Sequence, residues 1–197
     1  MSDSKALSNP LQSIIKKAAS TLPTTTGKVA VQQGRIDRRR GQTVILADIS
    51  GSMESAAGDG RRKIDVLRDA VAAARGQAKL VAFSARPREV ESIPEPEANT
   101  DLAAALEYVR ASDPGVTLVI SDGEPDNQGK ALAVAGSFRG AIDVLYIGPE
   151  SNTAAIAFMR RLASMAAGDV VINDIAGMGG VRMLQRQIAG LLQGPGA

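Results

Sequence analysis

From residue 43 onward, short aliphatic and β-branched runs alternate with longer segments whose apolar residues recur at helical spacing. A strand, a helix and a second strand in succession form a right-handed crossover that leaves the two strands parallel. The alternation therefore predicts an α/β, doubly wound fold, with a mostly parallel central sheet and helices on both faces. The predicted strands are 43–48, 78–84, 116–122, 141–148 and 169–174, and the predicted helices are 63–76, 100–112, 128–138, 152–168 and 181–193.

The segment RPREVESI, residues 86–93, is polar, alternating and flanked by proline, which predicts one antiparallel edge strand. Ahead of this body, residues 9–20 have helical spacing after Pro10, and residues 29–31 are typical of a brief strand. We expect residues 1–41 to form an N-terminal helix and linker, residues 42–193 the main domain, and residues 194–197 a flexible tail.

Composition restricts the chemistry, because the chain has no cysteine and no histidine among its 197 residues. Disulfides, thiolate or imidazole ligands, and cysteine or histidine catalysts are therefore excluded, and any metal must be held by oxygen. The 23 basic and 21 acidic residues nearly cancel, so we do not expect nucleic acid as a partner, and Arg38, Arg39 and Arg40 are interpreted as a solvated or salt-bridging turn. With neither a signal peptide nor a membrane-length apolar run, the expected location is cytoplasmic, with no membrane partner.

In the stretch ILADISGSM, residues 45–53, a buried strand ends at Asp48 and is followed by Ser50 and Ser52. Gly51 allows the backbone to bend between the two serines. Asp122 ends another strand, and Thr100 begins a helix. In a parallel sheet these positions share the rim at the carboxyl ends of the strands. Hydroxyls and carboxylates without nitrogen or sulfur are the ligands of a hard cation, Mg²⁺ first and Mn²⁺ or Ca²⁺ after it.

These residues resemble the metal-ion-dependent adhesion site of von Willebrand factor A (VWA) domains. The resemblance covers about residues 42–193 and is carried by DISGS at 48–52, by Thr100 and by the aspartate of SDGEPD at 122. It implies a Rossmann-like VWA fold and a metal site of Asp48, Ser50, Ser52, Thr100 and Asp122. In such a site the serines ligate directly, Thr100 ligates directly or through water, and the aspartates act largely through water.

The resemblance also implies a non-enzymatic role. A partner protein fills the open coordination position with a Glu or Asp, because a cation held mainly by neutral hydroxyls attracts a carboxylate strongly. Intracellular bacterial relatives of this kind often work beside MoxR-type AAA ATPases, so such an ATPase is an expected partner.

Two other functions compete with this one. A Mg²⁺-dependent phosphotransferase or phosphatase would use Asp48 as its nucleophile, but Ser50 stands where such enzymes need a second aspartate as general acid. A vestigial site on a mere scaffold is the third possibility, and the intact ligand set argues against it.

Several nearby features are left out of the site. Glu54, Asp101 and Asp126 are interpreted as solvated rim charges or helix first-turn residues. Thr100 is expected to cap its helix, with Asn99 or Asp101 able to share that role. The stretch 123–130 differs from a phosphate-binding loop, because five residues separate its glycines and Ala131 follows Lys130.

Overall fold

The computed structural model describes residues 33–34, 36–123 and 125–193. The chain divides into two compact units, Met1–Gly34 and Arg35–Ala197, and the sheet with its covering helices belongs to the second. The predicted helix at 9–20, the predicted strand at 29–31 and the predicted tail at 194–197 lie outside the described residues.

A six-stranded sheet forms the centre of this unit, in the order β3-β2-β1-β4-β5-β6. Every pair of neighbouring strands is parallel except β2 and β3. The α/β fold with one antiparallel edge strand is therefore confirmed, although that edge strand is only two residues long. The strands are β1 (Thr43–Asp48), β2 (Lys79–Phe83), β3 (Arg88–Glu89), β4 (Val116–Ser121), β5 (Ala141–Tyr146) and β6 (Val170–Ile172).

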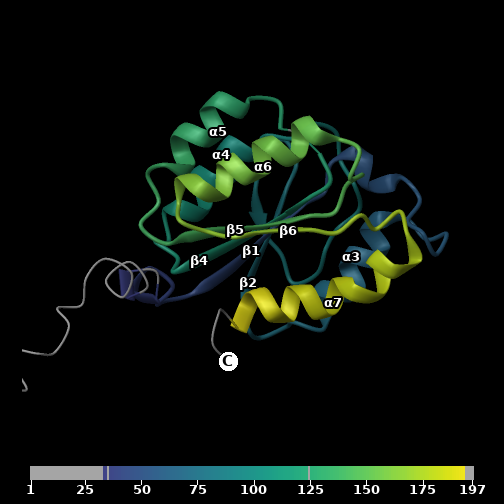
Figure 1. Ribbon diagram of the computed structural model, residues 1–197, viewed down its shortest axis with the longest axis horizontal. Coiled ribbons are helices and arrows are strands. Elements are labelled where there is room, and N and C mark those ends of the chain that lie inside the picture. The colour runs from purple at the N-terminus through teal and green to yellow at the C-terminus, as the bar shows by residue number, and fades with distance from the viewer. Residues whose placement is uncertain (1–32, 35, 124, 194–197) are drawn as a thin grey trace, which may run out of the picture. The chain divides into compact units, whose positions relative to one another are not determined.

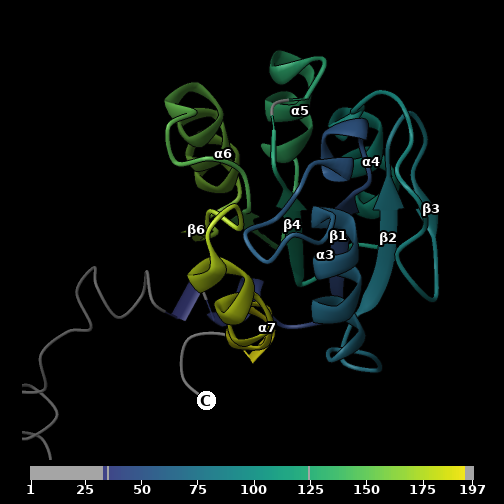
Figure 2. The ribbon, with the colours of Figure 1, turned by 90° about the vertical axis from the view of Figure 1, so that its right-hand side faces the viewer.

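Helices cover both faces of the sheet, with α4, α5 and α6 on one side and α3 and α7 on the other (Figures 1 and 2). A short 3-10 helix, η1, follows β1. The bounds are η1 (Gly51–Glu54), α3 (Lys63–Ala72), α4 (Leu102–Arg110), α5 (Gln128–Ala135), α6 (Thr153–Met165) and α7 (Met178–Gln193).

Strand β1 shows why the sheet needs both layers. Val44 and Leu46 belong to the core beneath α4, α5 and α6, whereas Ile45 and Ala47 belong to the core beneath α3 and α7. Successive side chains of a strand point to opposite faces, so an uninterrupted apolar run is stable only when both faces are covered. At about 1.5–3 kcal/mol per fully buried aliphatic side chain, this double burial favours the central position of β1.

A buried ion pair fastens the segment before β1 to the sheet. The Arg39 guanidinium donates to both carboxylate oxygens of Asp143 on β5, at 2.7 and 2.8 Å, and to Asp169 at 3.1 Å. Asp143 is fully buried and also accepts from the main-chain N–H of Asp169. Arg39 therefore forms a salt bridge, one of the two roles expected for the arginine run.

Candidate metal centre

The candidate site lies where β1 and β4 end side by side at the centre of the sheet. Asp48 is the last residue of β1, and Asp122 directly follows Ser121, the last residue of β4. The strand order reverses between these neighbours, since β2 and β3 lie to one side of β1 while β5 and β6 lie beyond β4. Ligands of open α/β sheets bind outside the carboxyl ends of the strands at such a switch point.

Asp48 forms the floor of the site. Its carboxylate is fully buried; Oδ1 accepts the main-chain N–H of Ser50 at 2.8 Å, and Oδ2 accepts the Ser121 hydroxyl at 2.6 Å. The first of these bonds closes a tight turn that directs the chain from the strand into η1. Asp48 thus fixes the loop that carries both serines and joins it to β4.

The two serines and Asp122 complete a chain of hydrogen bonds above Asp48. The hydroxyls of Ser50 and Ser52 are 3.0 Å apart, and Ser52 donates to Asp122 Oδ1 at 2.6 Å. Ser50 is 6% exposed and Asp122 5% exposed, whereas Ser52 lies at the surface. The structure therefore brings four of the five predicted site residues into one bonded cluster, which opens to solvent at Ser52.

Thr100 reaches the same rim on a separate loop. Its main-chain N–H donates to Asp126 at 3.2 Å, and the N–H of Asp126 donates back to the Thr100 carbonyl at 3.1 Å. Among the described residues, the hydrogen bonds that join Asp48, Ser50, Ser52 and Asp122 do not include Thr100. The rim position of Asp126 thus has a structural use, because it ties the Thr100 loop to the loop after β4.

The helix cap at this loop differs from the leading expectation. The side chain of Asp101, and not that of Thr100, accepts the N–H of Ala104 at 2.9 Å and caps α4. Asn99 adopts a positive φ of 72°, which turns the chain just before Thr100. Since Asp101 satisfies the helix end, the Thr100 hydroxyl is not needed there.

Sequence reasoning missed two residues of the site. The sequence pattern places Ser121 only in a strand and Lys63 only at the start of a helix. Lys63 Nζ donates to Asp122 Oδ2 at 2.7 Å, and its residue is 8% exposed. A signal for Lys63 exists in the sequence, because a cation in the first turn of a helix opposes the helix dipole and needs a compensating anion.

Burial sets the electrostatics of Asp48. Removal from water raises the pKa of this carboxyl from 3.8 to about 6, although hydrogen bonds from Ser121 and Ser50 oppose the rise. The negative charge of Asp122 adds to the increase. A buried carboxylate with this environment gains from any cation placed beside it.

The donor set fits a hard divalent cation. The cluster offers two serine hydroxyls and two carboxylates within one hydrogen-bonded group, and Mg²⁺ prefers oxygen donors of this kind. Across the described parts of the chain, no group of three or more His, Cys, Asp or Glu side chains could hold a metal. Hydroxyls would therefore have to supply much of the coordination here, as at the predicted site.

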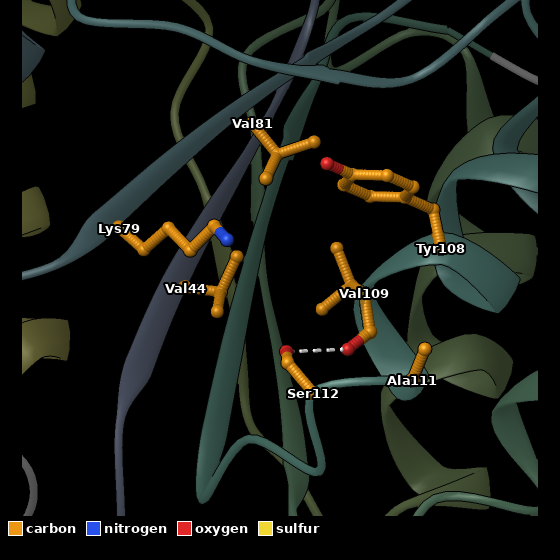
Figure 3. Close-up of a pocket in the computed structure, with 7 residues that line it drawn as sticks. All are labelled: Val44, Lys79, Val81, Tyr108, Val109, Ala111 and Ser112. Atoms are coloured by element: carbon orange, nitrogen blue, oxygen red, sulfur yellow. Dashed lines mark hydrogen bonds between the residues drawn. The ribbon is translucent and has the colours of Figure 1, made fainter.

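The described residues also form a shallow apolar cavity of about 260 Å³ at the opposite end of the sheet (Figure 3). Val44 and Lys79 line it from the starts of β1 and β2, and Val81 lines it from the middle of β2, across from Tyr108 of α4. This cavity is separate from the candidate metal centre, because Val44 and Asp48 occupy opposite ends of β1.

No protein-family model matches the chain, and no curated protein matches its sequence. The crystal structure of the Deinococcus radiodurans RO (RSR) protein is similar at a TM-score of 0.42 and 15% sequence identity. The match covers 76% of this chain and 35% of that one, so the chain spans about a third of the length of its structural neighbour. A likeness of this strength says nothing about the function of the site. Within the described residues, none of the helices has the length and apolar character needed to cross a membrane.

Proposed function

We propose that this chain is a VWA-type interaction module that binds Mg²⁺, or Mn²⁺ or Ca²⁺, and captures an acidic side chain of a partner protein. Asp48, Ser50, Ser52, Thr100 and Asp122 would hold the ion. The observation that carries the proposal is the single hydrogen-bonded cluster of Asp48, Ser50, Ser52 and Asp122 at the switch point of the sheet. The bound ion would supply an electrophilic centre for a carboxylate.

The four clustered residues each have a defined part in this mechanism. Ser50 and Ser52 present adjacent hydroxyl oxygens, 3.0 Å apart, that can turn from each other toward an ion. Asp48 holds their loop in place through the Ser50 N–H. Asp122 accepts from Ser52 and orients it, which suits an aspartate that acts on the ion through water.

The same contacts favour binding over phosphotransfer. A nucleophilic aspartate has to present a free oxygen to phosphorus. The Asp48 carboxylate is fully buried, and each of its oxygens accepts a hydrogen bond, from Ser50 or from Ser121. Asp48 is therefore better placed to organise the loop than to attack a substrate.

Titration calorimetry with Mg²⁺ and Mn²⁺ tests the proposal directly. Wild type should bind one ion, Ser50→Ala and Ser52→Ala should bind it at least about tenfold more weakly, and Ser164→Ala should match wild type, since Ser164 lies at the surface of α6. An ion at about 100 times its dissociation constant should stabilise the fold by about 2.7 kcal/mol. Absence of binding by wild type to either ion would refute the proposal.

Partner capture needs its own experiment. A pull-down with wild-type protein should retain an acidic partner in Mg²⁺ and release it on chelation, and Asp122→Asn should retain less. A MoxR-type AAA ATPase as partner stays a prediction from the resemblance, and the cytoplasmic location stays a prediction from the sequence. Hydrolysis of an aryl phosphate by wild type but not by Asp48→Asn would favour the enzyme instead.

A further inference from the structure

Lys63 brings a positive charge into the candidate metal centre. It is the first residue of α3, and its side chain reaches Asp122, which follows β4, with an Nζ–Oδ2 distance of 2.7 Å. The side chains of the pair are 10% and 2% exposed. Water therefore screens this ion pair much less than a surface pair, and both charges act at short range on whatever the site holds.

The contact divides the two oxygens of Asp122 between two donors. Ser52 donates to Oδ1 at 2.6 Å, and Lys63 donates to Oδ2 at 2.7 Å. The main-chain N–H of Lys63 is itself held by the Ser55 carbonyl at 2.9 Å, so the start of α3 is fixed against the loop that carries the serines. Asp122 is thus already neutralised by a cation of this chain.

Neighbouring arginines have other partners. Arg61 pairs with Asp59 and Asp69, and Arg62 pairs with Asp65 and Glu95. Within the described part of the chain, the ion pair between Lys63 and Asp122 is the one that involves a carboxylate of the candidate centre. Lys63 therefore sets the charge of the site.

We infer that Lys63 is the resident cation of this centre, and that it weakens metal binding while making the metal-loaded site attract one carboxylate. This inference rests on the proposed function. With Asp48 and Asp122 ionised and Lys63 protonated, the site carries one net negative charge. A divalent ion changes that to one positive charge, which a single acidic side chain neutralises. Without Lys63 the loaded site would be neutral, and a carboxylate would gain less from entering it.

Removing the Lys63 ammonium should therefore raise the affinity of the site for the metal and lower the affinity of the metal-loaded site for a carboxylate. At pH 8, Lys63→Met should bind Mn²⁺ at least about tenfold more tightly than wild type, because a charge within about 4–6 Å shifts an ionisation equilibrium by one to three powers of ten. Acetate, used as the carboxylate probe, should bind the Mn²⁺-loaded variant more weakly than loaded wild type. Lys63→Gln should follow Lys63→Met, and it keeps a hydrogen-bond donor for Asp122 if the methionine variant fails to fold.

Two further variants separate charge from packing. Lys63→Arg keeps the positive charge and should keep an Mn²⁺ affinity near that of wild type. Lys79→Met removes the same charge at the start of β2, where Lys79 pairs with Glu89, and should leave both affinities unchanged. Melting in chelator gives a readout that does not depend on metal. Lys63→Met should melt below Lys79→Met, since it leaves the buried Asp122 unpaired.

Equal Mn²⁺ affinities of wild type, Lys63→Met and Lys63→Gln would overturn the inference while leaving the proposed metal site intact. Weaker Mn²⁺ binding by both neutral variants would also overturn it, and would make Lys63 a support for the site. Failure of wild type to bind Mn²⁺ at all would instead refute the proposed function, and the inference with it.

Discussion

Replacing Asp48 by asparagine should make the metal-free protein more stable at neutral pH. The carboxyl is fully buried, and burial raises its pKa from 3.8 to about 6. Asparagine has nearly the same shape, can accept the Ser50 N–H, and carries no charge to desolvate. The variant should therefore lose the cost of holding a buried carboxylate in a site without a cation.

The sign and size of this gain in stability follow from the difference in the Asp48 pKa between the folded and unfolded states. Well below pH 3.8 both the folded and the unfolded wild type hold this proton, so Asp48 costs little. As the pH rises toward 6, the unfolded chain releases the proton while the folded chain keeps it, and stability falls. Above pH 6 the loss of stability is complete. The difference between the unfolded pKa of 3.8 and the folded pKa of about 6 corresponds to about 3 kcal/mol in the free energy of unfolding. For a chain of this size that is a difference of about 6–12 °C in melting temperature.

Thermal and urea unfolding in chelator, from pH 4 to pH 8, measure this directly. The stability of Asp48→Asn minus that of wild type should increase across the range, mostly between pH 4 and pH 6. Asp113→Asn, which removes a largely exposed carboxylate, should show no comparable trend. Millimolar Mg²⁺ at pH 8 should stabilise wild type more than Asp48→Asn. A stability difference that stays constant from pH 4 to pH 8 would refute the argument that burial of Asp48 costs stability.

Three further changes test the supports of the site. Arg39→Met leaves Asp143 buried and unpaired, so urea unfolding should show a loss of about 3–5 kcal/mol; a loss under 1 kcal/mol would mean that the pair contributes little. Gly148→Ala would place a methyl group against the main-chain oxygen of Asp122, so calorimetry should show weaker Mg²⁺ binding, and unchanged affinity would contradict that contact. Asp101→Ala removes the cap of α4 and should cost about 0.5–2 kcal/mol in the same unfolding assay, whereas Thr100→Ala should cost less; the reverse order would make Thr100 the cap.

The fold could be predicted because apolar runs and helical periodicity alternate so regularly. The helix boundaries were harder to predict. Helix α3 ends at Ala72, short of the predicted residue 76, and α6 ends at Met165, short of the predicted residue 168. Helix α5 ends at Ala135, short of the predicted residue 138. Gly136 follows its last residue, and the Ser137 hydroxyl donates to the Val134 carbonyl. Helix α7 begins at 178, ahead of the predicted residue 181.

The early start of α7 has a tertiary cause. Gly179 and Gly180 have poor helix propensity, which favours a helix that begins after them. The structure needs Gly180 inside the helix, because a side chain there would overlap the main-chain oxygen of Asp174. The Asn173 side chain also donates to the Gly180 carbonyl at 3.0 Å. Close packing against the loop after β6 therefore outweighs local propensity, and no pattern within the helix indicates it.

The candidate site also contains residues that the sequence could place and one that it could not. Asp48, Ser50, Ser52 and Asp122 could be placed together from sequence, because parallel strands bring their carboxyl ends to one edge. Lys63 could not, since its partner Asp122 is 59 residues away and the pairing depends on where α3 begins against the η1 loop. The position of Lys63 in the first turn of α3 indicates that it needs an anion, but no short sequence pattern identifies which carboxylate supplies it.

The charges of the site give a reason for the proposed function that does not depend on any resemblance. Asp122 has its countercharge in Lys63, whereas Asp48 is fully buried with hydrogen bonds from neutral donors and a raised pKa. A scaffold with no ligand would be more stable with asparagine at position 48, because the amide oxygen would still accept the Ser50 N–H and the buried charge would be gone. An aspartate kept at such a cost is explained if a cation neutralises it when the protein works. That cation has to be one other than Lys63, which already pairs with Asp122, and the oxygen donors of the two serines and of Asp122 favour a hard ion there.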